Sequence, residues 1–232
     1  MAHPSIVILT GAGISAESGL GTFRDEGGLW AQHRIEDEAT PEGFARNPQR
    51  VTDFYNTRRA QAHEATPNAG HAALARLQAE HKGDVLLVTQ NVDSLHEKAG
   101  SRDVVHMHGE LASALCSACD HRWSAPLKME VGQACPLCAA PTARPDIVWF
   151  GEMPYHMDRI EAALARADIF AAIGTSGNVY PAAGFVQIAA HVGARTVEMN
   201  LDPSETVALF DETRPGKASV TVPQWVDDIL SG

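Results

Sequence analysis

Four cysteines in two Cys-x-x-Cys pairs carry the strongest chemical signal in this sequence. Cys116 and Cys119 are separated by fifteen residues from Cys135 and Cys138, and the chain has no other cysteine. Thiol pairs at this spacing are typical of a tetrahedral zinc site, in which four thiolates leave no open coordination position. We therefore predict one structural Zn²⁺ ion. Two disulfides of a secreted protein are the alternative, but a strand-like run begins at Ser5 and leaves no room for a signal peptide.

A histidine shortly before the cysteines is a candidate general base. Imidazole has an unperturbed pKa of about 6.5, so it can exchange a proton near neutral pH. The chain has 11 histidines, and most must be surface or packing residues. His108 lies after a strand-like run and directly before Gly109, which favours it over His106 and His96. We expect His106 to be a packing neighbour.

A glycine turn follows the first strand-like run. Gly11, Gly13 and Ala16 fit the pattern G-x-G-x-x-G/A, in which backbone N–H groups meet a dinucleotide pyrophosphate. Tight strand-to-helix turns also use glycine for steric reasons alone, so this signal is weak by itself. The acidic residue that usually binds ribose about 20 residues on is missing from a strand end. We therefore do not predict an ordinary dehydrogenase.

Two further polar groups have a spacing that could serve a ligand. Asn91 and Asp93 follow an apolar run, and parallel sheets bind ligands at the carboxyl ends of their strands. A capped helix start is the alternative there. Tyr55 and Arg58 are three residues apart in a helix-like segment, so both lie on one face and could grip a carboxylate. From the spacing alone, a solvated helix face is the simpler interpretation of this pair.

Strand-like and helical segments alternate along the chain and must position these side chains. Apolar runs predict strands at 5–10, 84–89, 168–174 and 194–200, with weaker ones at 104–106 and 218–222. Helices are predicted over 71–77, 157–167 and 181–191. This alternation predicts an α/β fold with a Rossmann-like parallel sheet. The predicted division is a Rossmann-like domain of 1–29, 68–110 and 145–232, a helical insert over 30–67, and a small zinc-ribbon lobe over 111–144.

Composition excludes some classes of protein. The chain has 232 residues, of which 44% are hydrophobic and 20% charged, as is ordinary for a globular protein. A net charge of −11 argues against a general nucleic-acid partner, which normally needs a basic face. The longest apolar runs are far shorter than a membrane span. We expect a soluble cytoplasmic protein without a nucleic-acid or membrane partner.

Several motifs, in this order, resemble those of the sirtuins, a family of NAD-dependent protein-lysine deacylases, and most closely the bacterial CobB type. The resemblance covers essentially the whole chain. Its motifs are GAGISAESG at 11–19, TFR at 22–24, QNVD at 90–93, His108-Gly109, the two cysteine pairs, GTS at 174–176 and NLD at 200–202. One departure is Leu20-Gly21, where much of the family has an aliphatic residue followed by proline; the freer glycine predicts a less ordered cofactor loop without NAD.

The resemblance implies a reaction. In the family, the bond between nicotinamide and ribose of NAD⁺ breaks, and the carbonyl oxygen of an acyl-lysine captures the ribose C1′. A general base then acts at the ribose hydroxyls. His108 matches this base, and Asn91 matches the residue that orients the ribose, so these two are the expected catalytic residues. The products are nicotinamide, the free lysine and O-acyl-ADP-ribose.

The same match implies the remaining contacts to NAD, the co-substrate. Asp93 would hold the nicotinamide, and Phe23 would shield the reactive ribose from water. The expected cofactor-binding residues are Gly11, Ala12, Gly13, Ser15, Ala16, Glu17, Thr22, Phe23, Arg24, Trp30, Gln90, Asn91, Val92, Asp93, Gly174, Thr175, Ser176, Asn200, Leu201, Asp202 and Ala218.

The resemblance also bears on the acyl group. In the family, the Tyr-x-x-Arg pair marks class III, the branch that removes succinyl and malonyl groups, and Ala16 fits a roomy acyl pocket. We predict deacetylation together with desuccinylation or demalonylation. The substrate, an acylated-lysine protein or peptide, would enter as an extra strand between two edges. The expected substrate-binding residues are Tyr55, Arg58, Val148, Phe150, Gly151, Glu152, Gly177 and Val179.

Two other function classes remain as alternatives. A non-catalytic zinc-ribbon module with a nucleotide-sensing domain would keep the cysteines but has no use for His108 or Asn91. An ADP-ribosyltransferase would share the cofactor chemistry and pass ADP-ribose to a protein. Because the family is mostly monomeric, we expect a monomer.

Overall fold

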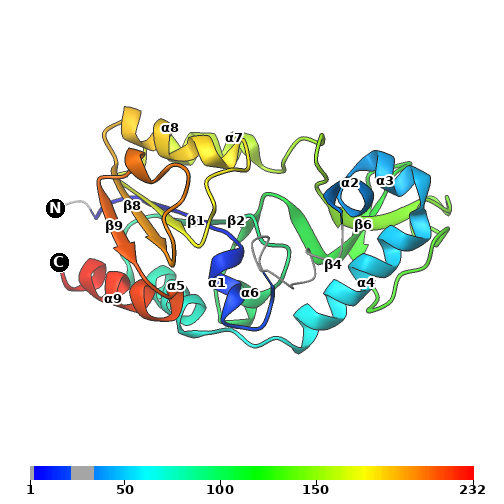
Figure 1. The fold of residues 1–232 in the computed structure, drawn as a ribbon, viewed down its shortest axis with the longest axis horizontal. Coiled ribbons are helices and arrows are strands. Elements are labelled where there is room, and N and C mark those ends of the chain that lie inside the picture. The colour runs from blue at the N-terminus through cyan, green and yellow to red at the C-terminus, as the bar shows by residue number, and fades with distance from the viewer. Residues whose placement is uncertain (1–2, 22–33) are drawn as a thin grey trace.

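The computed structural model describes residues 3–21 and 34–232, and these form two lobes (Figure 1). The larger lobe is built on a sheet of parallel strands in the order β3-β2-β1-β7-β8-β9. Its strands are β1 (Ile6–Thr10), β2 (Val85–Thr89), β3 (Val105–His106), β7 (Ile169–Ile173), β8 (Arg195–Asn200) and β9 (Glu212–Pro215). The predicted α/β fold with a parallel sheet is confirmed.

Helices cover both faces of this sheet, as a parallel sheet requires. One face packs against α1 (Ala12–Ala16), α5 (Ala69–Glu80) and α9 (Ala218–Ser231), with Leu74 and Trp225 fully buried. The other face packs against α7 (Met157–Leu164) and α8 (Phe185–His191), with Phe170 and Phe185 between them. Because both faces are buried, β1 and β7 consist of buried residues throughout, which is why their sequences are continuous apolar runs.

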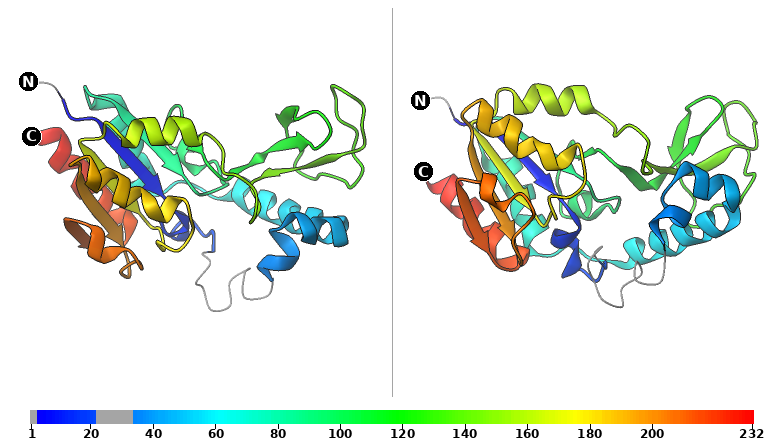
Figure 2. Two further views of the ribbon diagram at one scale, coloured as in Figure 1. Left: turned by 90° about the horizontal axis from the view of Figure 1, so that it is seen from above. Right: turned by 45° about the horizontal axis from the view of Figure 1, so that its top comes forward.

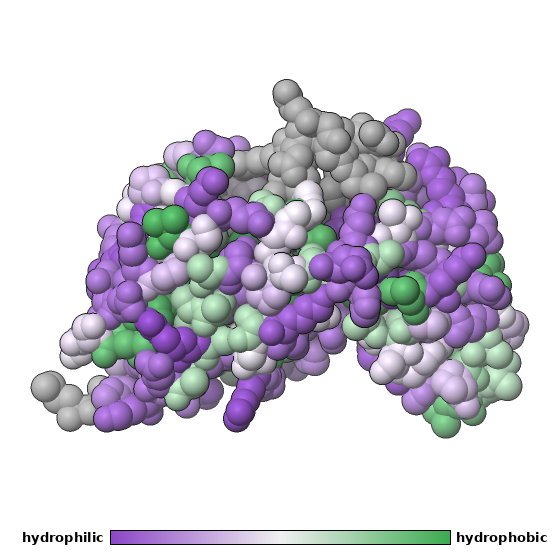
Figure 3. All heavy atoms as spheres, turned by 90° about the horizontal axis from the view of Figure 1, so that it is seen from below, coloured by the Kyte–Doolittle hydropathy of each residue, from purple (hydrophilic) through white to green (hydrophobic). Residues whose placement is uncertain are grey.

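The smaller lobe combines a short antiparallel sheet with helices from a separate part of the chain. The sheet has the order β5-β4-β6, formed by β4 (Gly109–Cys116), β5 (Arg122–Ser124) and β6 (Ala143–Ile147). Beside it lie α2 (Ile35–Glu38), α3 (Pro41–Arg46) and α4 (Pro48–Glu64) (Figure 2). The zinc segment and the helical segment therefore lie together in the smaller lobe, and a notch in the surface separates this lobe from the larger one (Figure 3). The exact division into 30–67 and 111–144 stays a prediction.

The remaining elements are short. They are α6 (Leu95–Lys98) and two 3₁₀ turns, η2 (Ala182–Gly184) and η3 (Val207–Leu209). The predicted helix over 181–191 is thus η2 followed by α8. Among the described residues no helix is both long and apolar enough to cross a bilayer.

One predicted strand is wrong. Residues 218–222 open helix α9 instead of forming a strand, and the last strand, β9, comes earlier. The run contains the β-branched residues Val220, Thr221 and Val222, which favour strands in a short window. The buried positions of the whole helix are Ala218, Thr221, Val222, Trp225 and Val226, which repeat at helical spacing. Packing of this face on the sheet outweighs the local β preference.

The glycine turn is needed for packing within the chain itself. A Cβ on Gly11 would lie 2.7 Å from the carbonyl oxygen of Gly174, and one on Gly13 would lie 2.7 Å from the Gly174 Cα. Gly174 in turn has φ +62, and its own Cβ would lie 2.4 Å from the Ile14 nitrogen. The end of β1 and the end of β7 therefore approach so closely that none of these three positions accepts a side chain.

Candidate active site at the edge of the parallel sheet

The described residues of the predicted cofactor motifs gather where β1, β2, β7 and β8 end. Asn91, directly after β2, is buried, and its Nδ2 donates to the Gly11 carbonyl at 3.0 Å and to Ser15 Oγ at 3.1 Å. Its backbone N–H donates to Thr89 Oγ1 at 3.0 Å. With both amide protons directed to the glycine turn, the Asn91 side-chain oxygen is left as the group that can accept a hydrogen bond from a ligand.

Asp93 is held in the same network. Ser15 Oγ donates to its Oδ2 at 3.1 Å, and the Leu95 N–H donates to its Oδ1 at 3.0 Å at the start of α6. Burial raises the pKa of the Asp93 carboxyl, and these two hydrogen bonds and the charges of His106 and Arg58 oppose that rise. Asp93 therefore accepts a hydrogen bond at the start of α6 and also lines a pocket, while its contact with nicotinamide stays a prediction.

His108 lies beside this group. Its Nδ1 donates to the Gln90 carbonyl at 3.2 Å. Burial lowers the pKa of His108 below its ordinary value, against a smaller opposite effect of that hydrogen bond. The imidazole is therefore neutral at pH 7, and with the proton on Nδ1 its Nε2 carries a lone pair. A neutral ring oriented through Nδ1 has the arrangement that a general base needs.

The strand ends on the other side are tied to this site. Gln90 Nε2 donates to Thr175 Oγ1 at 2.9 Å, and Asn200 Nδ2 donates to the Thr175 carbonyl at 2.9 Å. Ser176 follows in the same loop, and its Oγ accepts from the Asn178 N–H at 3.3 Å. Hydrogen bonds thus link the ends of β2, β7 and β8 into one polar rim.

Glu17 and Ala218 meet at the start of α9. The Glu17 carboxylate accepts from the Ser219 N–H at 3.1 Å and from Ser219 Oγ at 2.7 Å. These hydrogen bonds lower the pKa of Glu17, with the charge of Lys217 adding to the effect. Glu17 is therefore a capping residue of α9 in this structure. Leu201 and Asp202 lie exposed after β8.

Of the Tyr55 and Arg58 pair on helix α4, Arg58 lines a pocket beside the site and Tyr55 is buried. Arg58 and Asp93 line one pocket, whose wall consists of Leu20, Gly21, Arg58, Gln61, Ala62, Asp93 and Leu111. The Arg58 guanidinium lies 5.9 Å from the centre of the Phe54 ring. Burial lowers the pKa of Arg58, while the charge of Asp93 is among the effects that raise it.

Tyr55 is buried behind this arginine. Its hydroxyl accepts from Trp149 Nε1 at 3.1 Å, so its own proton is free to be donated elsewhere. Burial raises the pKa of Tyr55 to about 12, which keeps the phenol protonated at neutral pH. Arg58 therefore presents a guanidinium in the pocket that Asp93 also lines, and Tyr55 adds a protonated hydroxyl one helical turn before it.

The two segments that were predicted to contact the substrate differ in exposure and in packing. At 148–152, Trp149 is buried while Phe150 is 47% exposed, so Phe150 is the aromatic that can meet a substrate. Both carboxylate oxygens of Glu152 are engaged, one by the Trp149 N–H at 2.9 Å and one by Arg144 at 2.9 Å. Glu152 thus fixes the turn that contains Gly151. In the second edge, Gly177 packs against Thr206, where a Cβ would lie 2.7 Å from the hydroxyl oxygen.

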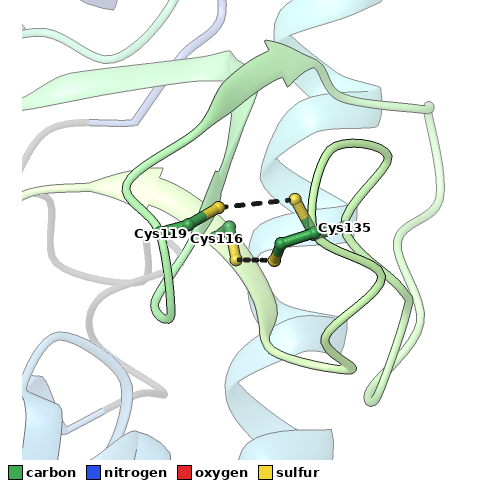
Figure 4. Close-up of side chains that lie close together, drawn as sticks. Cys116, Cys119 and Cys135 are labelled. Carbon is green, nitrogen blue, oxygen red and sulfur yellow. Dashed lines mark hydrogen bonds between the residues drawn. The ribbon is translucent and has the colours of Figure 1, made fainter.

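Cys116, Cys119 and Cys135 lie close together in the smaller lobe (Figure 4), and Cys138 completes the group of four. Their sulfur atoms are all within 4.8 Å of one another, with Cys116 and Cys138 3.7 Å apart and Cys119 and Cys135 3.8 Å apart. A tetrahedral ion with Zn–S bonds of about 2.3 Å requires sulfur atoms about 3.8 Å apart, so the geometry fits four-thiolate zinc. The sulfurs stay unlinked as free cysteines, which argues against the disulfide alternative.

Comparison with known proteins identifies the family. The model of the Sir2 family matches residues 11–181. An NAD-dependent protein deacylase of Vibrio parahaemolyticus is 56% identical over 232 residues, covering 99% of this chain and 96% of its own length. The enzyme of the same name from Salmonella typhimurium is 55% identical, covering 100% of this chain and 86% of its own length.

The chain belongs to the Sir2 family.

Solved Sir2 structures agree with this assignment. A Sir2 homologue in complex with NAD superposes with a TM-score of 0.89 at 38% identity, covering 98% of this chain and 90% of that one. A mutant Sir2 homologue in complex with ADP-ribose gives a TM-score of 0.91 at 37% identity, covering 98% and 92%. The expected fold, an NAD-binding domain with a zinc lobe, is thus the Sir2 fold.

Four residues that the Sir2 motifs place at the cofactor, Thr22, Phe23, Arg24 and Trp30, lie outside the described residues. Sequence reasoning in turn missed His71, which is fully buried and lies 3.5 Å from Ser15 Oγ through Nε2. Its Nδ1 accepts from the Asn68 N–H at 3.3 Å, and burial lowers its pKa to about 4. The spacing Asn68-x-x-His71 is that of a capping box, a signal that could have predicted this histidine's orientation.

Proposed function

We propose that this protein is an NAD-dependent protein-lysine deacylase that removes acetyl groups and also the acidic succinyl and malonyl groups, releasing nicotinamide and O-acyl-ADP-ribose. Its substrates are acylated-lysine proteins or peptides. The observation that carries the proposal is the position of Arg58 in one pocket with Asp93, next to a neutral His108 and a fixed Asn91. NAD⁺, when bound, supplies the cleavable bond between nicotinamide and ribose.

The protonation and hydrogen bonding of the chain's own residues then determine which step each of them serves. His108 Nε2 accepts a proton from a ribose hydroxyl, which requires the neutral ring that burial favours. The free side-chain oxygen of Asn91 orients the ribose, since both amide protons of Asn91 are already used. Asp93, which lines the pocket, would hold the nicotinamide. Each role needs a fixed orientation, and the internal hydrogen bonds of the site supply it before any substrate binds.

An acyl group that ends in a carboxylate suits the pair on α4. The Arg58 guanidinium and the Tyr55 hydroxyl can both donate to it, and charge-assisted hydrogen bonds of this kind contribute about 1.5–3 kcal/mol each. An acetyl group makes no such contact. Selectivity therefore depends on Arg58, whereas the chemistry depends on His108.

One panel of assays tests the proposal. Wild type, Arg58→Ala and His108→Ala are incubated with NAD⁺ and with matched acetyl-lysine or succinyl-lysine peptides, and loss of acyl mass is measured. Arg58→Ala should lose about 10- to 150-fold of kcat/KM on the succinyl peptide and much less on the acetyl peptide. His108→Ala should lose about 10²–10⁴-fold on both.

The control variant is Arg166→Ala, which removes an exposed arginine from the opposite lobe and should change neither activity. Equal losses on both peptides for Arg58→Ala would contradict the role of the arginine. Transfer of ADP-ribose label to protein with no deacylation would instead support an ADP-ribosyltransferase.

A further inference from the structure

His106, two residues before the predicted base, has an environment that a packing residue does not need. It is 5% exposed at the end of β3, and its ring nitrogens face two oxygen atoms. Nε2 lies 2.8 Å from Glu97 Oε1, and Nδ1 lies 3.2 Å from the backbone carbonyl of Asn91. A carbonyl and a carboxylate both accept hydrogen bonds and donate none. A neutral imidazole has one N–H and can satisfy one of them, whereas an imidazolium satisfies both.

The charged groups around His106 favour the imidazolium. Glu97 approaches from α6, Glu110 from β4 and Asp93 from the segment before α6, while His96 is the basic group nearby. Burial alone would lower the pKa of His106, but the hydrogen bond and charge of Glu97, aided by Glu110, outweigh it and raise that pKa. His96 does not compete, since burial and the two neighbouring histidines keep its pKa well below the ordinary value.

His106 and His108 donate to neighbouring carbonyls of the same loop, but their surroundings favour opposite charge states of the two rings. His106 donates to the Asn91 carbonyl and His108 donates to the Gln90 carbonyl, each through Nδ1 at 3.2 Å. Burial without a carboxylate partner lowers the pKa of His108, whereas the Glu97 carboxylate raises the pKa of His106. Environments that shift the pKa values of two titratable groups in opposite directions commonly give the two groups different roles in a reaction.

Within residues 3–21 and 34–232, the other hydrogen bonds of the Asn91 N–H and side chain come from the β1 and β2 side of the site. Its N–H is held by Thr89 and its side chain by Gly11 and Ser15. His106 is the partner that holds the carbonyl, and so it fixes the peptide that links Asn91 to Val92. The Val92 carbonyl in turn accepts from the Leu111 N–H at 2.8 Å, at the wall of the acyl pocket.

We propose that His106 is a positioning residue that, as an imidazolium bridging Glu97 and the Asn91 carbonyl, fixes Asn91 for the reaction, and that loss of its proton sets the alkaline limit of activity. The proposal rests on the proposed function, because Asn91 is given its task there. His106 is charged below its raised pKa, so activity falls as pH rises through that value. The acid limit belongs to His108, whose lowered pKa keeps it neutral to below about pH 6.5.

The pH dependence of kcat/KM tests this role with two variants. Glu97→Gln keeps the shape of the side chain but removes its charge, so the alkaline limit should move down by about one pH unit. His106→Asn places an amide near the position of Nδ1, where it can donate to the Asn91 carbonyl but cannot titrate, so the alkaline fall set by His106 should disappear. Glu161→Gln, an exposed glutamate on α7, is the matched control and should leave the profile unchanged. An unchanged alkaline limit in both variants would overturn the proposal.

A measurement without turnover separates this proposal from the proposed function. In ¹⁵N spectra of the histidine rings recorded across the pH range, His106 should lose its second proton above the ordinary histidine pKa in the wild type, and the titration should move to lower pH in Glu97→Gln. A wild-type His106 that titrates below the ordinary histidine pKa would refute the bridge even if the enzyme deacylates. A charged His106 in a protein that releases no acyl group would leave the bridge standing and remove the deacylase assignment.

Discussion

The two lobes of this protein are stabilised by different means. Among the described residues, the sheet of the larger lobe has two apolar clusters of 16 buried residues each, one on each face. In the smaller lobe, a cluster of eight buried residues joins α4 to Leu111 and Ile147 at one end of the antiparallel sheet. At the cysteine end of that sheet the cluster has three, Ala114, Met129 and Ala143, with Trp123 and Ala125 packed against it. Burial of apolar area contributes about 25 cal/mol per Å², so the larger lobe gains much more from its core than the cysteine end of the zinc segment does.

This difference matters for the active site because the site lies between the lobes. β4 begins at Gly109, directly after His108, and β6 ends at Ile147, two residues before Trp149. His108 therefore depends on the large sheet at one side and on the metal-dependent sheet at the other. Metal binding in such a lobe is coupled to its folding. We therefore expect damage to the smaller lobe to unfold that lobe alone, and damage to the core of the larger lobe to destabilise the whole protein.

Zinc removal should have the largest effect. A chelator, or Cys119→Ser, should unfold residues 109–147, because about 10–16 kcal/mol of apparent metal-binding free energy stabilises zinc segments of this kind. Deacylation should then be lost, while the large sheet remains folded. Hydrogen exchange resolved along the chain checks this, with fast exchange expected in β4 and protection retained in β7. Restored activity after adding Zn²⁺ back is the control, and full protection of β4 without metal would contradict the comparison.

The same contrast explains which parts of the fold could be predicted from the sequence. β1 and β7 are buried on both faces, so their apolar runs are continuous and the parallel sheet could be predicted. Strand formation at 218–222 was wrong because five residues do not show a helical repeat, which becomes visible only when Trp225 and Val226 are included. In the zinc segment, the cysteine spacing is the sequence signal that predicts the fold, and the pattern of apolar residues adds almost nothing to it.

For the site, sequence could supply residue types but not their partners. His108 and Asn91 stand out through the motifs that they belong to, and the structure brings both to one sheet edge. Glu97 and His106 are nine residues apart on separate elements, and their ion pair forms only because α6 turns back toward β3. Prediction of His106 as a packing neighbour was correct about its burial and silent about its charge.

A truncation in the core of the larger lobe should have the next largest effect, and a global one. Trp225 is 1% exposed in the cluster between α9 and the sheet, so Trp225→Ala should lower the free energy of unfolding by about 3–5 kcal/mol. Val220→Ala on the same helix is the matched control, since Val220 is 51% exposed and should change it by about 0.5 kcal/mol or less. Denaturant unfolding measures both. Similar losses from the two variants would mean that the sheet does not depend on this core.

The smallest effect is expected where the lobes are joined. Lys98 at the end of α6 donates to the carbonyls of Ala62, His63 and Ala65, at 2.9, 2.7 and 3.0 Å, and so holds the carboxyl end of α4. Because α4 carries Arg58 and α6 follows Asp93, this lysine ties the helix of Arg58 to the segment of Asp93, and so the proposed acyl pocket to the proposed NAD site. A cation at a helix carboxyl end contributes about 0.3–1 kcal/mol when exposed, as Lys98 is.

Lys98→Met should therefore lower the free energy of unfolding by about 1 kcal/mol or less. It should also reduce kcat/KM for succinyl-lysine more than for acetyl-lysine, because the acetyl group does not use Arg58. Lys98→Arg, which keeps the charge and several N–H donors, should retain most of both quantities. Denaturant unfolding and the paired peptide assays measure the two effects separately. If Lys98→Met lost stability but left the ratio of the two activities unchanged, α4 would be positioned by its apolar contacts with β4 and β6 alone, and the junction between the lobes would be set by packing instead of by this lysine.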